Sequence, residues 1–431
     1  MATTLPEPLE PSRADLLRRA AAFAGTPSYA YLLDVVLERI GQVRAAFPQF
    51  DISFAAKSNP NLELLRALLP AVDSLDASSI GEVERALQAG FSPGRISFSG
   101  PAKRPVELER AVANRCGLLV CESARELEQV NALAGARGYR APVAIRINPR
   151  QVPRNFGVNM AGKPSQFGID EEDLSSLVGP IQTLDCISLE GFHIYSGTNA
   201  LNEEAIAENF GIFCRLFTTF ADAFDIHPRL LIFGSGFGIP YHPGQSSLDL
   251  SRLSALVAPL IDGLRADRRL RDARLALEMG RFLVGPAGYF LTSVVAVKRS
   301  RGTDICLCDG GFNNHLAAFG LMGTVIRRNW SMWNLSARPG AVPAKQTLVG
   351  PLCTTIDTLA QDVELPALAT GDLVAVGASG AYGLSASPIH FISHPVPRET
   401  LVRTSATGDS AFKDVSESDS QLSGAAVLGS R

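Results

Sequence analysis

A lysine follows an apolar segment early in the chain, in the stretch AAKSNP at residues 55–60. Residues 52–56 are predicted to form a buried strand, and Lys57 would lie at the end of it, where a strand opens onto a binding site. Burial there lowers the proton affinity of an amine, which could then form a Schiff base with a carbonyl compound. A lone lysine at a strand end is more often a surface residue, so Lys57 is a candidate catalytic residue only together with other motifs.

Two later strand ends could bind an anionic ligand. The predicted strand 230–233 runs into GSGFGIPY at residues 234–241, where glycines allow a ligand to approach the backbone and N–H groups can surround an anion. The predicted strand 273–278 ends in Glu278, followed by Gly280 and Arg281. The carboxylate could hold a protonated ring nitrogen while the glycine and the arginine reach a phosphate. A tight turn and a strand-end ion pair are the structural alternatives.

Three further motifs contain candidate site residues. His193 lies in the predicted strand 189–194, and Ser196 follows it with a hydroxyl that would suit a phosphate. A lone histidine in an apolar run is more often a satisfied core residue. GPLC at residues 350–353 and GAYG at residues 380–383 stand in a later region, and a cysteine near a Gly-Pro turn is usually just a small buried residue.

The elements that would position these residues alternate regularly between strand and helix. Apolar residues spaced three and four apart predict helices at 61–69, 80–89, 105–114 and 124–133. β-branched runs predict strands at 52–56, 74–76, 96–98, 117–120, 143–147, 189–194, 230–233 and 273–278. This repeat predicts a (β/α)8 barrel over residues 31–285, which places chemistry at the carboxyl ends of its strands.

The flanking segments differ from this repeat. Strand-like runs without regular helices predict a mostly β domain over residues 286–405, of the β-sandwich or β-barrel kind. Residues 1–30 are expected to be a partly loose N-terminal segment, and the Ser- and Gly-rich residues 406–431 a disordered tail.

Composition excludes several classes of function. The 431 residues have a net charge of −3 and no basic run, so a nucleic-acid surface is not indicated. No apolar stretch of about 18 residues predicts a membrane span. Seven scattered cysteines fit a reducing cytoplasm. Cys306 and Cys308 lie two apart on a predicted strand, and we interpret them as strand packing; no metal site is predicted.

Taken together and in order, these segments resemble the fold-type III decarboxylases that depend on pyridoxal 5'-phosphate (PLP). Ornithine, arginine and diaminopimelate decarboxylases belong to that family, and alanine racemase is more distant. The resemblance covers residues 27–402. It rests on AAKSNPN, LDASSIGE, GFHIYSG, GSGFGIPY, EMGRFLVGPAG, and GPLC with GAYG.

The resemblance implies a role for each matched residue. Lys57 matches the lysine that carries PLP, His193 the histidine stacked on the pyridine face, and Glu278 the acid that pairs with the pyridine nitrogen. Cys353 matches a cysteine, supplied by the partner subunit, that protonates the substrate carbon after carbon dioxide leaves. Members of this family form homodimers with shared active sites. The matched phosphate contacts are Ser196, Gly236, Gly238, Gly280, Arg281 and Tyr382, and polar positions near the cofactor are Asp76 and Arg146.

The sequence also departs from the best-known members. In ornithine and diaminopimelate decarboxylases an acid directly follows the cysteine and holds the distal end of the substrate; here that residue is Thr354, and an acid appears only at Asp357. SGPAK at 99–103, DGGFNNHL at 309–316 and VIRRN at 325–329 resemble a subgroup that acts on carrier-protein-bound amino acids or siderophore intermediates. Arg327 and Arg328 could meet a phosphate or carboxylate of such a conjugate, although a solvated basic pair is as good an interpretation.

We therefore expect a PLP-dependent decarboxylase of an amino-acid conjugate in secondary metabolism. The alternative is a decarboxylase of free diaminopimelate or another basic amino acid. A racemase is less favoured, because Cys353 replaces the tyrosine base that racemases use. A non-catalytic PLP-binding protein would lack the β domain.

Overall fold

The computed structural model describes residues 7–321, 328–405 and 408–417. The described chain divides into two compact units. The first takes residues from segments 1–37, 240–246 and 283–431, and the second consists of residues 38–239 and 247–282. The amino-terminal segment, expected to be a partly loose extension, thus groups with the β-rich unit.

The second unit is built around a closed barrel of parallel strands, which confirms the predicted (β/α)8 fold. Each strand pairs in parallel with its neighbours, and pairing of the strands at either end closes the ring. In order around the barrel, the strands are β5 (Leu118–Cys121), β4 (Ile96–Phe98), β3 (Ser74–Ala77), β2 (Phe50–Ala55), β12 (Arg274–Met279), β11 (Leu230–Gly234), β9 (Ile187–Ile194) and β6 (Ala141–Asn148).

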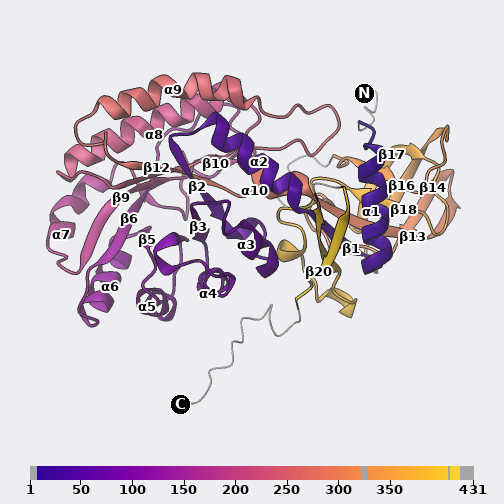
Figure 1. Cartoon of the computed structure of the whole chain (residues 1–431), viewed down its shortest axis with the longest axis horizontal. Helices are drawn as coiled ribbons and strands as arrows, with labels where there is room; N and C mark the ends of the chain where they lie inside the picture. Colours follow the sequence, from indigo (N-terminus) through magenta and orange to yellow (C-terminus); the bar gives the residue numbers. More distant parts are fainter. Residues whose placement is uncertain (1–6, 322–327, 406–407, 418–431) are drawn as a thin grey trace, which may run out of the picture. The chain divides into compact units, whose positions relative to one another are not determined.

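Helices lie outside these strands (Figure 1). Several begin at side chains that accept backbone N–H bonds, as Asn61, Ser79, Ser123 and Asn202 do, and such caps explain where the helices begin. The helices are α2 (Leu33–Ala46), whose first turn belongs to the other unit, α3 (Leu62–Leu68), α4 (Ile80–Ala89), α5 (Pro105–Ala113), α6 (Ala124–Gly135), α7 (Val178–Gln182), α8 (Glu203–Ala223) and α9 (Leu250–Ala266).

Small and branched side chains fill the inside of the barrel, among them Val120, Ala144, Ile232 and Ala276. At the amino-terminal mouth a cavity of about 430 Å³ remains, with charged residues among its lining. These charges are largely paired: Arg274 Nη2 lies 2.6 Å from Asp51 Oδ2, and Arg229 pairs with Glu190. The charges at this mouth are therefore used in structural ion pairs, and candidate chemistry lies at the opposite mouth.

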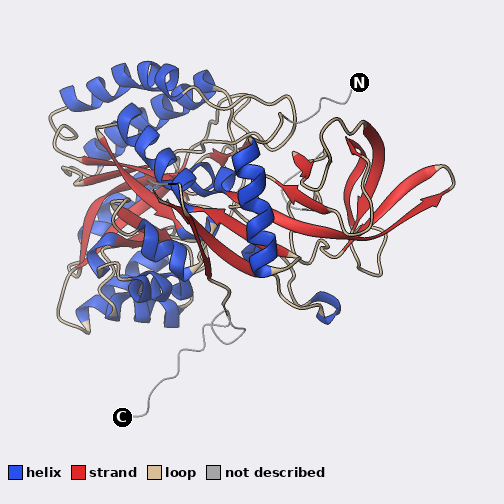
Figure 2. Cartoon of the chain, turned by 45° about the vertical axis from the view of Figure 1, so that its right-hand side comes forward, coloured by secondary structure: helices blue, strands red, loops and turns tan. Residues whose placement is uncertain are grey.

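The first unit is mostly sheet, as predicted (Figure 2). Its central strand β13 (Gly288–Ser300) is flanked by β14 (Thr303–Cys308) and β1 (Ser28–Leu32), and Cys306 and Cys308 are buried in β14. The remaining strands are β15 (Met332–Asn334), β16 (Pro343–Val349), β17 (Thr358–Pro366), β18 (Leu373–Val376), β19 (Arg398–Thr404) and β20 (Ser410–Asp414).

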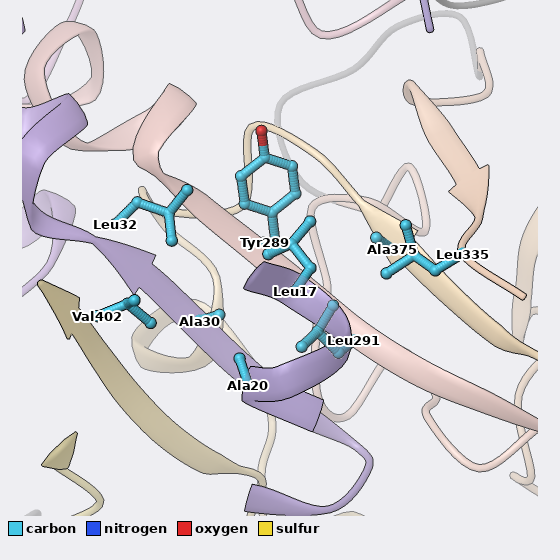
Figure 3. Close-up of a cluster of buried hydrophobic side chains, with 9 residues drawn as sticks. All are labelled: Leu17, Ala20, Ala30, Leu32, Tyr289, Leu291, Leu335, Ala375 and Val402. Atoms are coloured by element: carbon cyan, nitrogen blue, oxygen red, sulfur yellow. The ribbon is translucent and has the colours of Figure 1, made fainter. Parts of the chain in front are cut away.

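A helix missing from the sequence-based assignment packs on this sheet. Helix α1 (Pro11–Ala24) buries Leu17 and Ala20 in an apolar cluster with side chains of several strands (Figure 3). The expected disordered tail also needs correction, because residues 410–414 form β20, and Phe412 packs against the same cluster. Residues 406–407 and 418–431 of that expected tail lie outside the described residues.

Candidate active site

The carboxyl ends of the barrel strands bring together charged side chains that lie far apart in the sequence. Lys57 follows β2, Asp76 lies in β3, Arg146 in β6, His193 in β9 and Glu278 in β12. Because the strands are parallel, their carboxyl ends share one mouth of the barrel. The structure thus places these five predicted residues around one site.

Glu278 joins two of its neighbours directly. Its Oε1 lies 3.0 Å from Lys57 Nζ, and its Oε2 lies 2.8 Å from His193 Nε2. Burial alone would raise the pKa of this carboxyl, but Lys57 and His193 outweigh burial and hold the pKa well below its usual range. Glu278 is therefore a buried anion that both partners stabilise.

His193 is buried and is expected to be neutral at physiological pH. Burial lowers its pKa, although the bond to Glu278 acts in the opposite direction. Its Nδ1 has no hydrogen-bond partner among the described residues.

Asp76 lies at the same mouth in a different environment. Ser97 and Ser99 donate hydrogen bonds of 2.7 and 2.8 Å to its two carboxylate oxygens. Burial, followed by repulsion from Glu278, raises the pKa of Asp76 to about 7. The two serine hydroxyls were not singled out in the sequence.

Glycine backbone and a buried hydroxyl lie in the turns that follow β9 and β11. Ser196 Oγ is fully buried and has no hydrogen-bond partner within the described chain. A Cβ on Gly236, whose φ is +66°, would lie 2.7 Å from Phe156 Cζ, and a Cβ on Gly238 would lie 2.7 Å from the carbonyl oxygen of Ala200. The surface that they form fits a phosphate that needs donors and a close approach to the backbone.

Gly280 and Arg281 follow Glu278 after one residue, Met279. A Cβ on Gly280 would lie 2.5 Å from Ser58 Oγ, so only glycine lets this turn lie against the residue that follows Lys57. Arg281 begins the short helix α10 (Arg281–Val284) and is half-buried. The donor set therefore suits PLP, with a covalent anchor, a carboxylate for the ring and a phosphate surface.

The remaining predicted residues belong to the first unit. Cys353 is exposed, and Tyr382 adopts a φ of +54°. Thr354 is half-buried, Arg328 is exposed, and Arg327 lies outside the described residues.

Asp357 points its carboxylate into the first unit. It accepts hydrogen bonds of 2.8 Å from the backbone N–H groups of Phe312 and Leu352, and burial raises its pKa. The geometry favours a structural role in joining two turns.

Two residues at the barrel mouth were missed in the sequence. Tyr195 places its ring centroid 5.1 Å from Lys57 Nζ. Glu122 directly follows the apolar strand β5 and lies 3.0 Å from Arg146 Nη1. An acid at a strand end was the signal used for Glu278, and the same signal could have found Glu122.

The residues that the structure describes contain neither a metal-binding group nor a membrane-spanning helix. No group of three or more His, Cys, Asp and Glu side chains could hold a metal ion. None of the described helices is long and apolar enough to cross a membrane.

Comparison with known proteins found extensive similarity. A family model for the pyridoxal-binding domain of pyridoxal-dependent decarboxylases matches residues 33–285. The L-glutamyl-[BtrI acyl-carrier protein] decarboxylase of Niallia circulans is 35% identical over 382 residues, 88% of this chain and 89% of that protein. The diaminopimelate decarboxylase of Aquifex aeolicus is 30% identical over 394 residues, 90% of this chain and 89% of that protein. The crystal structure of Helicobacter pylori diaminopimelate decarboxylase with L-lysine superposes with a TM-score of 0.81 at 25% identity, covering 94% of this chain and 98% of that one.

Proposed function

We propose that this chain, which belongs to the family of pyridoxal-dependent decarboxylases, removes carbon dioxide from an amino acid held in a conjugate. It is a PLP-dependent amino-acid decarboxylase. The proposal concerns the substrate, which would be tethered to a carrier protein or form part of a siderophore intermediate. The observation that carries it is the position of Asp357, whose carboxylate is occupied by two backbone N–H groups.

Lys57, His193 and Glu278 would hold the cofactor at the barrel mouth. Bound PLP supplies an electron sink for the electron pair left when the bond from Cα to the carboxylate breaks. Lys57 would anchor PLP covalently, and the neutral His193 ring would lie against the pyridine face. The ionised Glu278 carboxylate would keep a proton on the ring nitrogen, because its low pKa leaves it charged at every physiological pH.

The phosphate would lie on the surface formed by glycine backbone and the buried hydroxyl. The contacts would be Ser196, Gly236, Gly238, Gly280, Arg281 and Tyr382. Asp76 and Arg146 would contact polar atoms of the cofactor from neighbouring strands. The unpartnered Ser196 hydroxyl supports this assignment.

Cys353 would return a proton to Cα after carbon dioxide leaves. In this proposal the chain forms a homodimer, and each site takes its cysteine from the partner subunit. The exposure of the Cys353 thiol is compatible with presentation to a second chain.

The distal end of the substrate distinguishes a conjugate from a free diamine precursor. Free ornithine, lysine and diaminopimelate carry a distal ammonium, for which related enzymes place an acid at the position of Thr354. Asp357 is the nearest acid in the sequence, but its buried, hydrogen-bonded carboxylate would have to break two bonds to serve instead. Identity of 35% with a carrier-protein glutamyl decarboxylase, against 30% with a diaminopimelate decarboxylase, points in the same direction.

Carbon dioxide release over a substrate panel tests the proposal. Free ornithine, lysine and diaminopimelate should be poor substrates, because an ammonium desolvated without its counter-charge costs about 2–5 kcal/mol. The panel also contains two kinds of conjugate, which the proposal expects to be the better substrates. They are an L-glutamyl thioester on phosphopantetheine or on a carrier protein, and an amino acid amide-linked to citrate. A kcat/KM of about 10⁴ M⁻¹s⁻¹ or more with any of the three free amino acids would contradict the proposal and support a decarboxylase of free amino acids instead.

Thr354→Asp provides a matched variant for this experiment. It restores an acid beside Cys353 and should raise turnover of the free diamine precursors while leaving PLP content unchanged. Thr354→Asn is the control, because asparagine has the size of aspartate without its charge.

A further inference from the structure

A single buried carboxylate connects three segments at the barrel mouth. Glu122 follows β5 and is 6% exposed. Its Oε1 lies 3.0 Å from Arg146 Nη1 and accepts the Gly100 N–H at 2.9 Å, while its Oε2 accepts the Gly168 N–H at 2.8 Å. The donors come from the turn after β4, from β6 and from the loop after β6.

Glu122 is ionised at this position. Burial raises the pKa of its carboxyl, but Arg146, Lys103 and the Gly168 N–H outweigh burial and lower it. Arg146 is itself buried, and its guanidinium carbon lies 4.6 Å from the centroid of the Phe167 ring. A buried guanidinium needs a fixed counter-charge, and Glu122 is the acid in contact with it.

A second ion pair fixes the backbone of Glu122. Glu126 Oε2 accepts the Glu122 N–H at 2.7 Å, and Glu126 Oε1 lies 2.6 Å from Lys103 Nζ. Lys103 also donates to the carbonyl oxygens of Gly100 and Val120. The four buried side chains Arg146, Glu122, Lys103 and Glu126 alternate in charge and sum to zero. The carboxylate of Glu122 is thus held by one ion pair and its backbone by the other.

The loop held by Glu122 reaches the proposed phosphate surface. Strand β7 (Val158–Asn159) pairs with β10 (Gly197–Thr198), and the Met160 N–H donates to the Ser196 carbonyl at 2.8 Å. Phe156 is buried close to Gly236. Gly168, at the end of this loop, is the residue that Glu122 binds.

We propose that Glu122 is a positioning residue, which fixes Arg146 and the loop 149–168 and acts on the cofactor site only through them. It does not touch the reacting atoms. The proposal rests on the cofactor contact proposed above for Arg146, and its test needs no substrate.

The test compares Glu122→Gln with Asp51→Asn. Both changes turn a carboxylate into an amide in a barrel ion pair with arginine, but Asp51 lies at the opposite mouth. Hydrogen exchange of the holoenzyme should become about tenfold faster for amides of segment 149–168 in the Glu122 variant only, because the Gly168 N–H loses its anionic acceptor. PLP affinity, measured by titration of the apoprotein, should fall in the same variant.

A double-mutant cycle with Arg146→Gln separates positioning from an independent effect. If Glu122 acts partly through Arg146, the PLP affinity lost in the double variant should be smaller than the product of the two single losses. Losses that multiply would overturn the proposal, and so would exchange and PLP affinity in Glu122→Gln that match Asp51→Asn. If Glu122→Gln does not fold, Glu122→Asp, which keeps the charge on a shorter side chain, is measured in the same way and should give an intermediate change in exchange; wild-type exchange in that variant would equally overturn the proposal.

Discussion

Two carboxylates at one barrel mouth have their pKa values moved in opposite directions. Glu278 faces Lys57 and His193, which stabilise its charge, so its pKa falls. For Asp76, burial and then repulsion from Glu278 outweigh the attraction of Lys57 and the two serine hydrogen bonds, and raise its pKa to about 7. Both side chains are almost fully buried. Their neighbours therefore give one residue a permanent charge and the other a proton near neutral pH.

Glu278→Gln should keep PLP but lose most decarboxylation. An amide cannot hold the ring nitrogen protonated as a carboxylate does, and removal of a preorganised electrostatic partner costs about 10²–10³-fold in kcat. PLP content is measured by absorbance and kcat by carbon dioxide release. Glu190→Gln, which changes a paired acid at the amino-terminal mouth, should retain activity. Near-normal turnover of a PLP-loaded Glu278→Gln protein would contradict the assignment.

Asp76→Asn should change how stability depends on pH. The folded apoprotein keeps a proton on Asp76 up to pH about 7, whereas the unfolded chain loses it near the ordinary value of 3.8. The free energy of unfolding therefore falls as pH rises from about 4 to about 7, by at most about 1.4 kcal/mol per pH unit from this group. Urea unfolding of the apoprotein at pH 5 and pH 7 should show a smaller fall in the variant. Equal slopes in both proteins would show that the pKa of Asp76 is not raised.

Turns between strands and helices form the proposed phosphate surface. Gly238 follows β11, and its backbone N–H donates 2.8 Å to the Ala200 carbonyl oxygen, the same atom that a Cβ on Gly238 would approach. The turn after β9 and the turn after β11 thus hold each other at a distance that only glycine permits.

Gly238→Ala should weaken PLP binding by about 1–3 kcal/mol, the usual cost of overpacking. The added methyl group would push the two turns apart. Gly263→Ala is the matched control, because a Cβ there meets nothing within 4 Å in α9 and should stabilise the helix by roughly 0.5–1 kcal/mol. The measurement is titration of the two apoproteins with PLP. Equal affinities would mean that binding of the PLP phosphate does not depend on this turn.

The regular elements of the barrel could be predicted from the sequence, because parallel strands are continuous apolar runs and their helices have a 3.6-residue period. The candidate residues at strand ends were found for the same reason. Helix α1 and β20 were missed, because a polar, alanine-rich helix and a short edge strand are decided by packing against a distant sheet. The burial of Asp357 could not be predicted either, since one of its two N–H donors, Phe312, lies 45 residues away in the sequence.

The proposed site residues are divided between the two units. Lys57 belongs to the barrel unit and Cys353 to the β-rich unit. If each site of a homodimer takes Lys57 from one chain and Cys353 from the other, the two residues can be inactivated separately and restored by mixing.

Mixing Lys57→Ala chains with Cys353→Ala chains should restore activity that neither variant has alone. Random exchange makes half of the dimers mixed, and each mixed dimer holds one site with both residues intact and one with neither. The expected recovery is therefore about a quarter of wild-type activity, measured after chain exchange has been verified with two differently tagged chains. The control mixes wild-type chains with chains that carry both substitutions. Each mixed dimer then has two sites with one defect each, so chain exchange should lower the activity of this mixture from about a half to about a quarter of wild type. Absence of recovery in the first mixture, with exchange demonstrated, would mean that Lys57 and Cys353 of a single chain serve the same site.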